Sequence, residues 1–262
     1  MDCRRSAGPD FPMPHFSRSR PAFSAGLRRW LSVAGPALLA LGLLAGCMNP
    51  PANDASRVGP FFAPTNHVGD PVQPAGLRRV VLMPLAGEAV APAASLGSLD
   101  PVVSAALLHQ NRFEVVALSR EACLRLFGAE EFSSVEALPA NFMAVLRREY
   151  AADGVLLVDV TAFQGYRPLL IGLRAKLATL QDVRLVWSFD TLFSAADATV
   201  ANSARRHALA GSRSDVPADF TPSALQSPSL FMAYAADAMF ATLPPLSAPP
   251  SGAKPAGHPA TH

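Results

Sequence analysis

GVLLVDVTAF at residues 154–163, LLIGLRAKLATL at 169–180 and VRLVWSFDTLF at 183–193 follow one another with short connections between them. Each stretch is rich in β-branched, aromatic and other large apolar residues, the composition that strands prefer. Because connections this short join antiparallel neighbours, the three stretches predict an antiparallel three-strand meander. The rest of the fold must cover the apolar side of this meander.

Side-chain parity predicts the register of the meander. The apolar residues occupy even positions in the first strand and odd positions in the other two: Leu156, Val158, Val160, Ala162; Ile171, Leu173, Ala175, Leu177; Val183, Leu185, Trp187, Phe189. Matching these faces across the two turns places Asp159 opposite Arg174, and Arg174 opposite Asp190. We expect a solvated row of opposite charges worth about 0.2–1 kcal/mol per pair. The alternatives are a ligand site, or a two-residue slip that brings Lys176 opposite Asp159.

Strand and helix patterns alternate on both sides of the meander. A strand within residues 78–85 contains Val80 to Met83, and Asp100 with Pro101 predicts the start of a helix that stops near Asn111. The other predicted elements are a strand at 113–118, helices from Ser119 to Gly128 and from Pro139 to Tyr150, and helices at 197–209 and from Ser227 to Pro244. This order predicts an α+β domain of two to three layers, with a mixed sheet of about five strands and helices packed on it.

The amino-terminal region has the pattern of an export signal. Arg28 and Arg29 precede an uncharged stretch at residues 31–44, which Pro36 interrupts and which is shorter than the roughly 20 residues of a membrane span. We therefore predict a signal peptide at residues 1–46, with Met13 as the start because no acidic residue then precedes the apolar stretch. Sec export is expected, and a twin-arginine signal is the alternative.

Composition changes once this leader is set apart. Six of the 22 basic residues and two of the 20 acidic residues precede Cys47. The chain from Cys47 onward therefore has 16 basic and 18 acidic residues, a net charge of −2. This balance argues against nucleic acid as a partner, because such proteins carry clustered Lys and Arg. Cys123 is the one cysteine left beside Cys47, so no intramolecular disulfide is expected.

Proline marks the limits of the folded region. The chain has 25 prolines, of which eleven precede residue 77 and six follow residue 242. We predict a Pro-rich tether at residues 47–76, a globular domain at 77–243 and a disordered Pro/Ala/Ser tail at 244–262.

The residues Leu44-Ala45-Gly46-Cys47 resemble the lipobox of bacterial lipoproteins. That resemblance implies cleavage between Gly46 and Cys47 and lipidation of Cys47, including a palmitoyl-type acyl chain. Met48, where inner-membrane lipoproteins of enterobacteria carry aspartate, implies the outer membrane and its periplasmic side.

The folded region also resembles a lipoprotein group, on the strand Val80-Val81-Leu82-Met83-Pro84, the stretches at 111–116 and 152–158, and Val186-Trp187 in the meander. This group comprises the curli-secretion channel lipoproteins (CsgG-like), the lipoprotein activators of penicillin-binding proteins (LpoB-like) and the amino-terminal domain of the Tol-system propeller protein. The resemblance implies an α+β envelope module and covers residues 78 to about 195.

No recognisable catalytic, phosphate-binding or metal-binding motif is present, so we expect no enzyme activity, no cofactor and no metal. His109 is expected to be a helix-end residue and Cys123 a small core residue. Arg205, Arg206 and His207 are the candidate partner face, and a solvated helix face is the alternative.

We expect a membrane-anchored, non-catalytic binding or assembly module whose partner is another envelope protein or a peptidoglycan-associated component. One alternative is an oligomeric subunit of an export assembly, and another is an unrecognised envelope hydrolase or ligand-binding protein.

Overall fold

The computed structural model describes residues 59–87, 89–211 and 224–246, which all belong to one compact unit. The elements are β1 (His67–Gly69), β2 (Arg79–Leu82), α3 (Ala93–His109), β3 (Glu114–Ala117), α4 (Arg120–Phe127), α5 (Phe142–Tyr150), β4 (Gly154–Gln164), β5 (Leu170–Thr179), β6 (Leu185–Ser194), α6 (Ala198–Gly211) and α7 (Pro228–Phe240).

The strands form one mixed sheet in the order β1-β6-β5-β4-β2-β3. β2 is parallel to β3 and β4, whereas β4, β5, β6 and β1 pair antiparallel. The α+β class and the meander are confirmed. The sheet has six strands rather than about five, because β1 was not recognised in the sequence.

Most of the meander has the cross-strand partners that parity predicts, with Asp159 opposite Arg174 and Arg174 opposite Asp190. An irregularity between Val160 and Ala162 reverses the alternation at the end of β4, so Phe163 packs against the core and the prediction that Ala162 does so was wrong.

An irregularity after Leu177 makes Val186 an extra residue in β6, which is buried beside Trp187. This bulge turns Leu185 to the other side of the sheet, because an extra residue reverses the alternation. The prediction that Leu185 faces the core was therefore wrong, and it is 49% exposed. The same prediction for Val183 was wrong because Val183 lies in the turn before β6, where it is 60% exposed.

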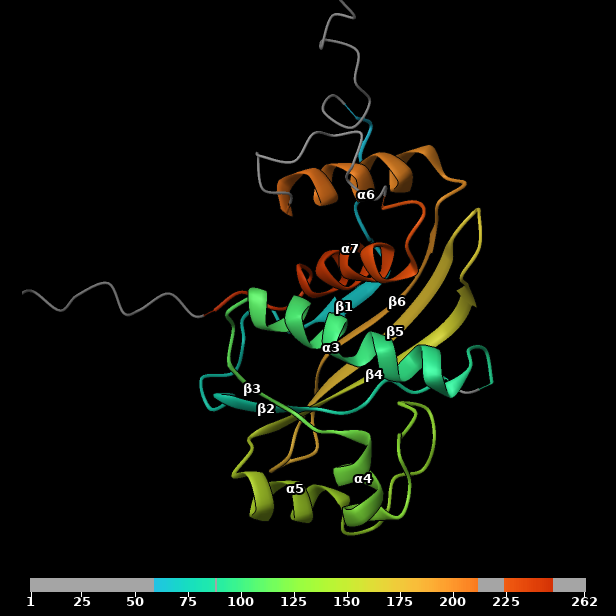
Figure 1. Ribbon diagram of the computed structural model, residues 1–262. Helices are drawn as coiled ribbons and strands as arrows, with labels where there is room; N and C mark the ends of the chain where they lie inside the picture. Colours follow the sequence, from blue (N-terminus) through green and yellow to red (C-terminus); the bar gives the residue numbers. More distant parts are fainter. Residues whose placement is uncertain (1–58, 88, 212–223, 247–262) are drawn as a thin grey trace, which may run out of the picture. The chain divides into compact units, whose positions relative to one another are not determined.

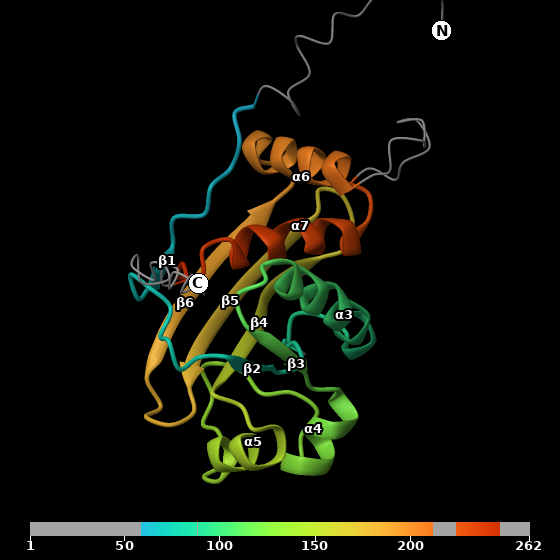
Figure 2. The same ribbon diagram turned by 90° about the vertical axis from the view of Figure 1, so that its left-hand side faces the viewer.

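Helices lie on both faces of the sheet (Figure 1). One core cluster joins α3, α6 and α7 to the meander and contains Trp187, Phe189, Phe193, Phe231 and Phe240. A second cluster, on the opposite face, joins α4 and α5 to the strands β2 and β4. Three layers result, and α4 and α5 lie at the opposite end of the sheet from α6 (Figures 1 and 2).

Local capping explains where several of these helices begin and end. The Ser119 hydroxyl accepts a hydrogen bond from the Ala122 N–H (3.1 Å), and Gly128 ends α4 in the left-handed conformation. Ser227 caps α7 by accepting from the Leu230 N–H (3.4 Å), and Pro228 occupies the first turn. Both helix starts were predicted from these residues.

The start of α3 differs from its prediction. The helix begins at Ala93, seven residues before Asp100, and Pro101 lies inside it. Proline removes one backbone N–H there, but Leu96, Leu99, Val103 and Leu107 share one buried face and hold the helix together. The carboxylate of Asp100 instead accepts a hydrogen bond from the Leu85 N–H (2.9 Å).

The predicted tether also differs from the structure at residues 59–76, which are part of the fold. β1 adds to the free edge of β6, and the Phe62 ring packs on Phe193 at 5.6 Å between centroids. Gln73 donates its N–H to the Pro245 carbonyl (2.8 Å), so the start of the predicted tail contacts this segment too. Figure 2 shows the segment passing α6 before it reaches β1. The predicted leader, the tether at 47–58 and the tail from 247 lie outside the described residues.

Candidate functional site

A groove of about 540 Å³ lies between α3 and α7, with α6 at one side. Its apolar lining consists of Pro101, Val102, Ala105, Ala106, Leu230 and Ala233. Asp100 is the one acidic or basic residue in α3 apart from the terminal His109, and Asp237 is the one charged residue in α7. Helices that are apolar all round are normally covered all round. Leu108 and Leu230 are nevertheless 55% and 36% exposed, so this helix pair presents apolar surface to solvent.

Polar groups gather at one point of this groove, around the carboxylate of Asp237. Oδ1 lies 3.3 Å from Nδ1 of His109 and accepts a hydrogen bond from Nε2 of Gln110 (2.8 Å). Oδ2 lies 3.3 Å from Nε2 of His207. The cluster therefore ties α3, α6 and α7 together through one acidic side chain.

The pKa of Asp237 is lowered, chiefly by the contact with His207 and also by that with His109, while partial burial opposes the shift. The carboxylate is ionised at neutral pH, and the lowered pKa extends this ionised state to more acidic pH. An anion within a mainly apolar groove is complementary to a cationic side chain. The groove thus offers both apolar contact and one charge that can set the orientation of a bound segment.

The lowered pKa gives a stability that depends on pH. Because the folded pKa lies below the unfolded one, this contribution is complete above the unfolded pKa of about 4 and is lost as pH falls through the folded pKa. Asp237→Asn should reduce the free energy of unfolding at pH 7 by about 1 kcal/mol and flatten its decline between pH 5 and 3. Urea titrations across this range provide the measurement.

Two histidine variants serve as a graded control for this effect. His207→Ala should flatten the pH dependence more than His109→Ala does, because His207 is the larger cause of the lowered pKa. An unchanged slope in Asp237→Asn would show that other carboxylates dominate the acid response.

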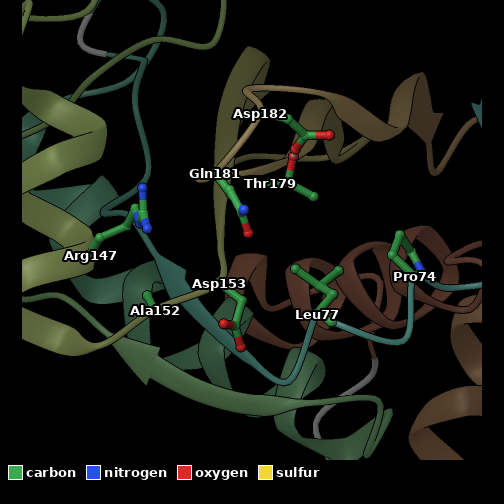
Figure 3. A pocket seen from close by; sticks show the side chains of 9 residues that line it. Pro74, Leu77, Arg147, Ala152, Asp153, Thr179, Gln181 and Asp182 are labelled. Carbon is green, nitrogen blue, oxygen red and sulfur yellow. Dashed lines mark hydrogen bonds between the residues drawn. The ribbon is translucent and has the colours of Figure 1, made fainter.

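A second pocket, of about 370 Å³, lies where β2 and β4 begin (Figure 3). Arg147 from α5 and Gln181 from the β5–β6 turn point toward it, beside Asp153. Oδ2 of Asp153 accepts the backbone N–H groups of Arg78 and Arg79, both at 3.0 Å. Through these bonds Asp153 holds the start of β2 in place, so its carboxylate has a structural role and is not directed at a ligand.

The other carboxylate at this pocket belongs to Asp182, in the turn between β5 and β6. It accepts a hydrogen bond from the Thr179 hydroxyl, which is the main cause of its lowered pKa. Asp182 and Asp153 thus both hold the chain itself. The pocket of Figure 3 has a mixed polar and apolar lining and lacks the extended apolar walls of the groove, which makes it the weaker candidate.

The predicted charge row is only partly solvated. Nε of Arg174 lies 2.8 Å from Oδ2 of Asp190, and these side chains are half-exposed. Asp159 is 5% exposed instead, and it accepts hydrogen bonds from the N–H and hydroxyl of Ser134. The loop that precedes α5 covers this end of the row, which strand parity alone does not reveal. Lys176 donates a hydrogen bond to the Ser134 carbonyl at 2.8 Å. The same loop therefore forms hydrogen bonds with both Asp159 and Lys176.

The three residues of the predicted partner face do not lie on one surface. Arg205 and Arg206 are exposed on α6. His207 faces α7 and Asp237, so the expectation that it turns away from the core was wrong. The reason is helical geometry: successive residues point about 100° apart around the helix axis, so the residue after Arg206 points to a different side of α6.

Sequence reasoning missed an ion-pair network under the loop after β2. Nε of Arg120 donates to Oδ2 of Asp100 (2.8 Å), and Nη1 donates to Oε2 of Glu131 (2.6 Å). Nη2 donates to the Leu85 carbonyl (2.7 Å). Burial lowers the pKa of Arg120, but hydrogen bonds to Glu131 and Asp100 outweigh it and the net pKa is raised. No spacing signal marks this network, since its members come from three separate segments.

Cys123 is fully buried among the residues of the second core cluster, where burial raises the pKa of its thiol to about 11. Among residues 59–87, 89–211 and 224–246, no group of three His, Cys, Asp or Glu side chains is arranged to hold a metal ion. Over the same ranges, no helix has the length and apolar character needed to cross a membrane. Gly46 and Cys47, the predicted cleavage and lipidation site, lie outside the described residues.

No protein-family model and no curated protein matches the chain. Several solved structures align with part of it, including PelC, GNA1162 and the LpoB C-terminal domain. PelC from Paraburkholderia phytofirmans, solved as a dodecamer, is 14% identical over 49% of this chain and 78% of its own, with a TM-score of 0.35. The lipoprotein GNA1162 from Neisseria meningitidis is 17% identical over 46% and 85%, with a TM-score of 0.35. The LpoB C-terminal domain from Salmonella enterica is 15% identical over 44% and 82%, with a TM-score of 0.30. Similarities this low transfer no site and no activity to this chain.

Proposed function

We propose that this chain is a lipid-anchored, non-catalytic binding module of the bacterial cell envelope, held by Cys47 at the outer membrane and facing the periplasm. The observation that carries the proposal is the groove between α3 and α7, whose walls are apolar on helices that lack a polar side. The lipobox-like residues 44–47 support the location at a membrane. An apolar groove of this kind is suited to binding a segment of a partner protein.

The partner that fits the groove is an apolar segment of another envelope protein with a lysine or arginine beside Asp237. Apolar side chains of the partner would bury Leu230 and Val102, which are partly exposed. The carboxylate of Asp237 would receive the cation, since it is the one acidic group in the lining. The histidines on either side of it orient this carboxylate toward α3 and α6.

Site-specific photocrosslinking in cells tests this proposal. A photoreactive phenylalanine at position 230 should give an adduct with an envelope protein of different sequence, and the crosslinked peptide should be apolar and contain Lys or Arg. Leu192, which is 54% exposed on β6, is the matched control position and should give no such adduct. Asp237→Asn should reduce the yield at position 230 about fivefold or more, the effect of losing roughly 1 kcal/mol.

Two outcomes would contradict the proposal. Equal adducts from positions 230 and 192 would mean that the groove has no special role. An adduct at twice the mass of the chain would show that a second copy occupies the groove, and the protein would then belong to the class of oligomeric assembly subunits.

A further inference from the structure

The outer side of α6 is a local concentration of positive charge on a chain that is otherwise slightly acidic after residue 46. Val200, Ala201 and Ala204 pack this helix onto the core. Arg205 and Arg206 are exposed on its other side, next to Leu209, which is 46% exposed. Asp197, the acidic residue nearest to this pair along the helix, precedes Arg205 by eight positions, about 12 Å along a helix axis.

The first described residues are fixed to this same helix. Nδ2 of Asn202 donates to the Pro60 carbonyl (3.3 Å), and the Ser203 hydroxyl accepts from the Phe62 N–H (2.8 Å). The guanidinium carbon of Arg206 lies 4.5 Å from the centre of the Phe61 ring, a cation–π contact. Figure 2 shows this segment running beside α6. The chain therefore enters the domain at α6.

The length of chain before this entry point limits how far α6 can be from a lipid anchor. Pro60 lies thirteen positions after Cys47 in the sequence. A chain of that length spans at most about 45 Å in any conformation. Confinement within such a distance gives effective concentrations in the millimolar range, so even a weak contact with the bilayer would be populated.

We propose that the outer face of α6, formed by Arg205, Arg206, Leu209 and Phe61, rests on the anionic phospholipid headgroups of the membrane that holds the anchor. This inference rests on the lipidation of Cys47 in the proposed function. The arginines are complementary to phosphate groups and bind them in a bidentate manner. Leu209 and the ring of Phe61 supply apolar surface at the depth of the headgroups. The membrane contact leaves the groove between α3 and α7 available to a partner.

The membrane contact of α6 can be tested without lipidation by the cell if the protein is coupled to a lipid chemically. The chain from residue 47 onward can be coupled through the Cys47 thiol to a maleimide lipid, because Cys123 is buried and has a raised pKa. A donor fluorophore is attached through an azido-phenylalanine at exposed position 210 of α6, or at position 121 of α4 as the reference, and acceptor lipids label the vesicle surface. The vesicles are phosphatidylethanolamine with one quarter phosphatidylglycerol, or phosphatidylcholine alone.

Energy transfer on the anionic vesicles should be greater from position 210 than from position 121, and 0.5 M salt should remove the difference. Each arginine near an anionic surface changes the binding constant about fivefold, so Arg205→Glu with Arg206→Glu should weaken the contact at least about 25-fold. Arg147→Glu with Arg148→Glu reverses an adjacent pair on α5 and is the matched control, which should leave the transfer unchanged.

Transfer that is no greater from position 210 than from position 121 would overturn the inference, as would an equal response to the two double variants. Neither result depends on whether cells lipidate the protein. Failure of this contact and failure of the anchor are therefore separate outcomes.

Discussion

Cys47→Ala is expected to move this protein out of the membrane fraction, because residue 47 carries the lipid in the proposed anchor. Each buried methylene contributes about 0.8 kcal/mol, so two or three acyl chains make attachment effectively permanent, whereas a chain without them has no comparable hold. Wild-type protein should sediment with membranes and leave them only with detergent. Fractionation followed by immunoblotting, with acyl-chain detection by mass spectrometry, measures both.

A second variant is needed because loss of the cysteine also removes the predicted cleavage point, and an uncut leader could itself hold the chain. Placing an Ala-x-Ala sequence at residues 44–46 together with Cys47→Ala allows the leader to be removed without lipid. This variant should be soluble in the periplasm. Its retention in membranes after leader removal would contradict the anchoring proposal.

Arg120→Met should be the most destabilising change in the ion-pair network, with a loss of about 3–5 kcal/mol in the free energy of unfolding. Arg120 and Glu131 are only 16% and 15% exposed at their side chains, so removal of the cation leaves two acids close together in a poorly solvated site. The Leu85 carbonyl also loses its donor. Urea denaturation at pH 7 provides the comparison with wild type.

Arg125→Met is the matched control, since it makes the same substitution on the same helix. Arg125 pairs with Glu121 at 3.8 Å, and the two side chains are 67% and 90% exposed. Such a pair contributes about 0.5 kcal/mol or less. Similar losses from the two variants would mean that the network around Arg120 is solvated and contributes little. In that case Asp100→Asn combined with Glu131→Gln should leave stability near that of wild type.

Local signals in the sequence predict much of this fold. The parity of the meander predicts which residues pair across it, because a one-residue slip would expose its whole apolar side. Ser119, Gly128 and Ser227 predict helix ends, since their capping roles depend on neighbours within three or four positions.

Features that depend on distant segments could not be predicted in the same way. β1 has three exposed residues, and only the free edge of β6 makes it a strand. Asp100 and Pro101 have the local pattern of a helix start, yet burial of Leu96 and Leu99 extends α3 past them. At β1 and at the start of α3, tertiary packing decides the secondary structure against the local sequence pattern.

The candidate groove shows the same limit more clearly. His109, His207 and Asp237 come from three helices that only the folded chain brings together. The sequence does show that α3 and α7 lack a polar side, which is a usable signal for a covered surface. The centre of the groove becomes visible only when the helices are packed.

The attachment of residues 59–69 to the edge of the domain has a mechanical consequence. Tension on the anchor would load the contacts at Pro60 and Phe62 first and then the short β1–β6 ladder, before any strand of the meander. This segment has few buried contacts and should peel off as a unit at low force. Its eleven residues would add about 35 Å to the reach of the chain. If the protein is anchored as proposed, this segment is a reserve of length that lets the domain move farther from the membrane while the other five strands stay folded.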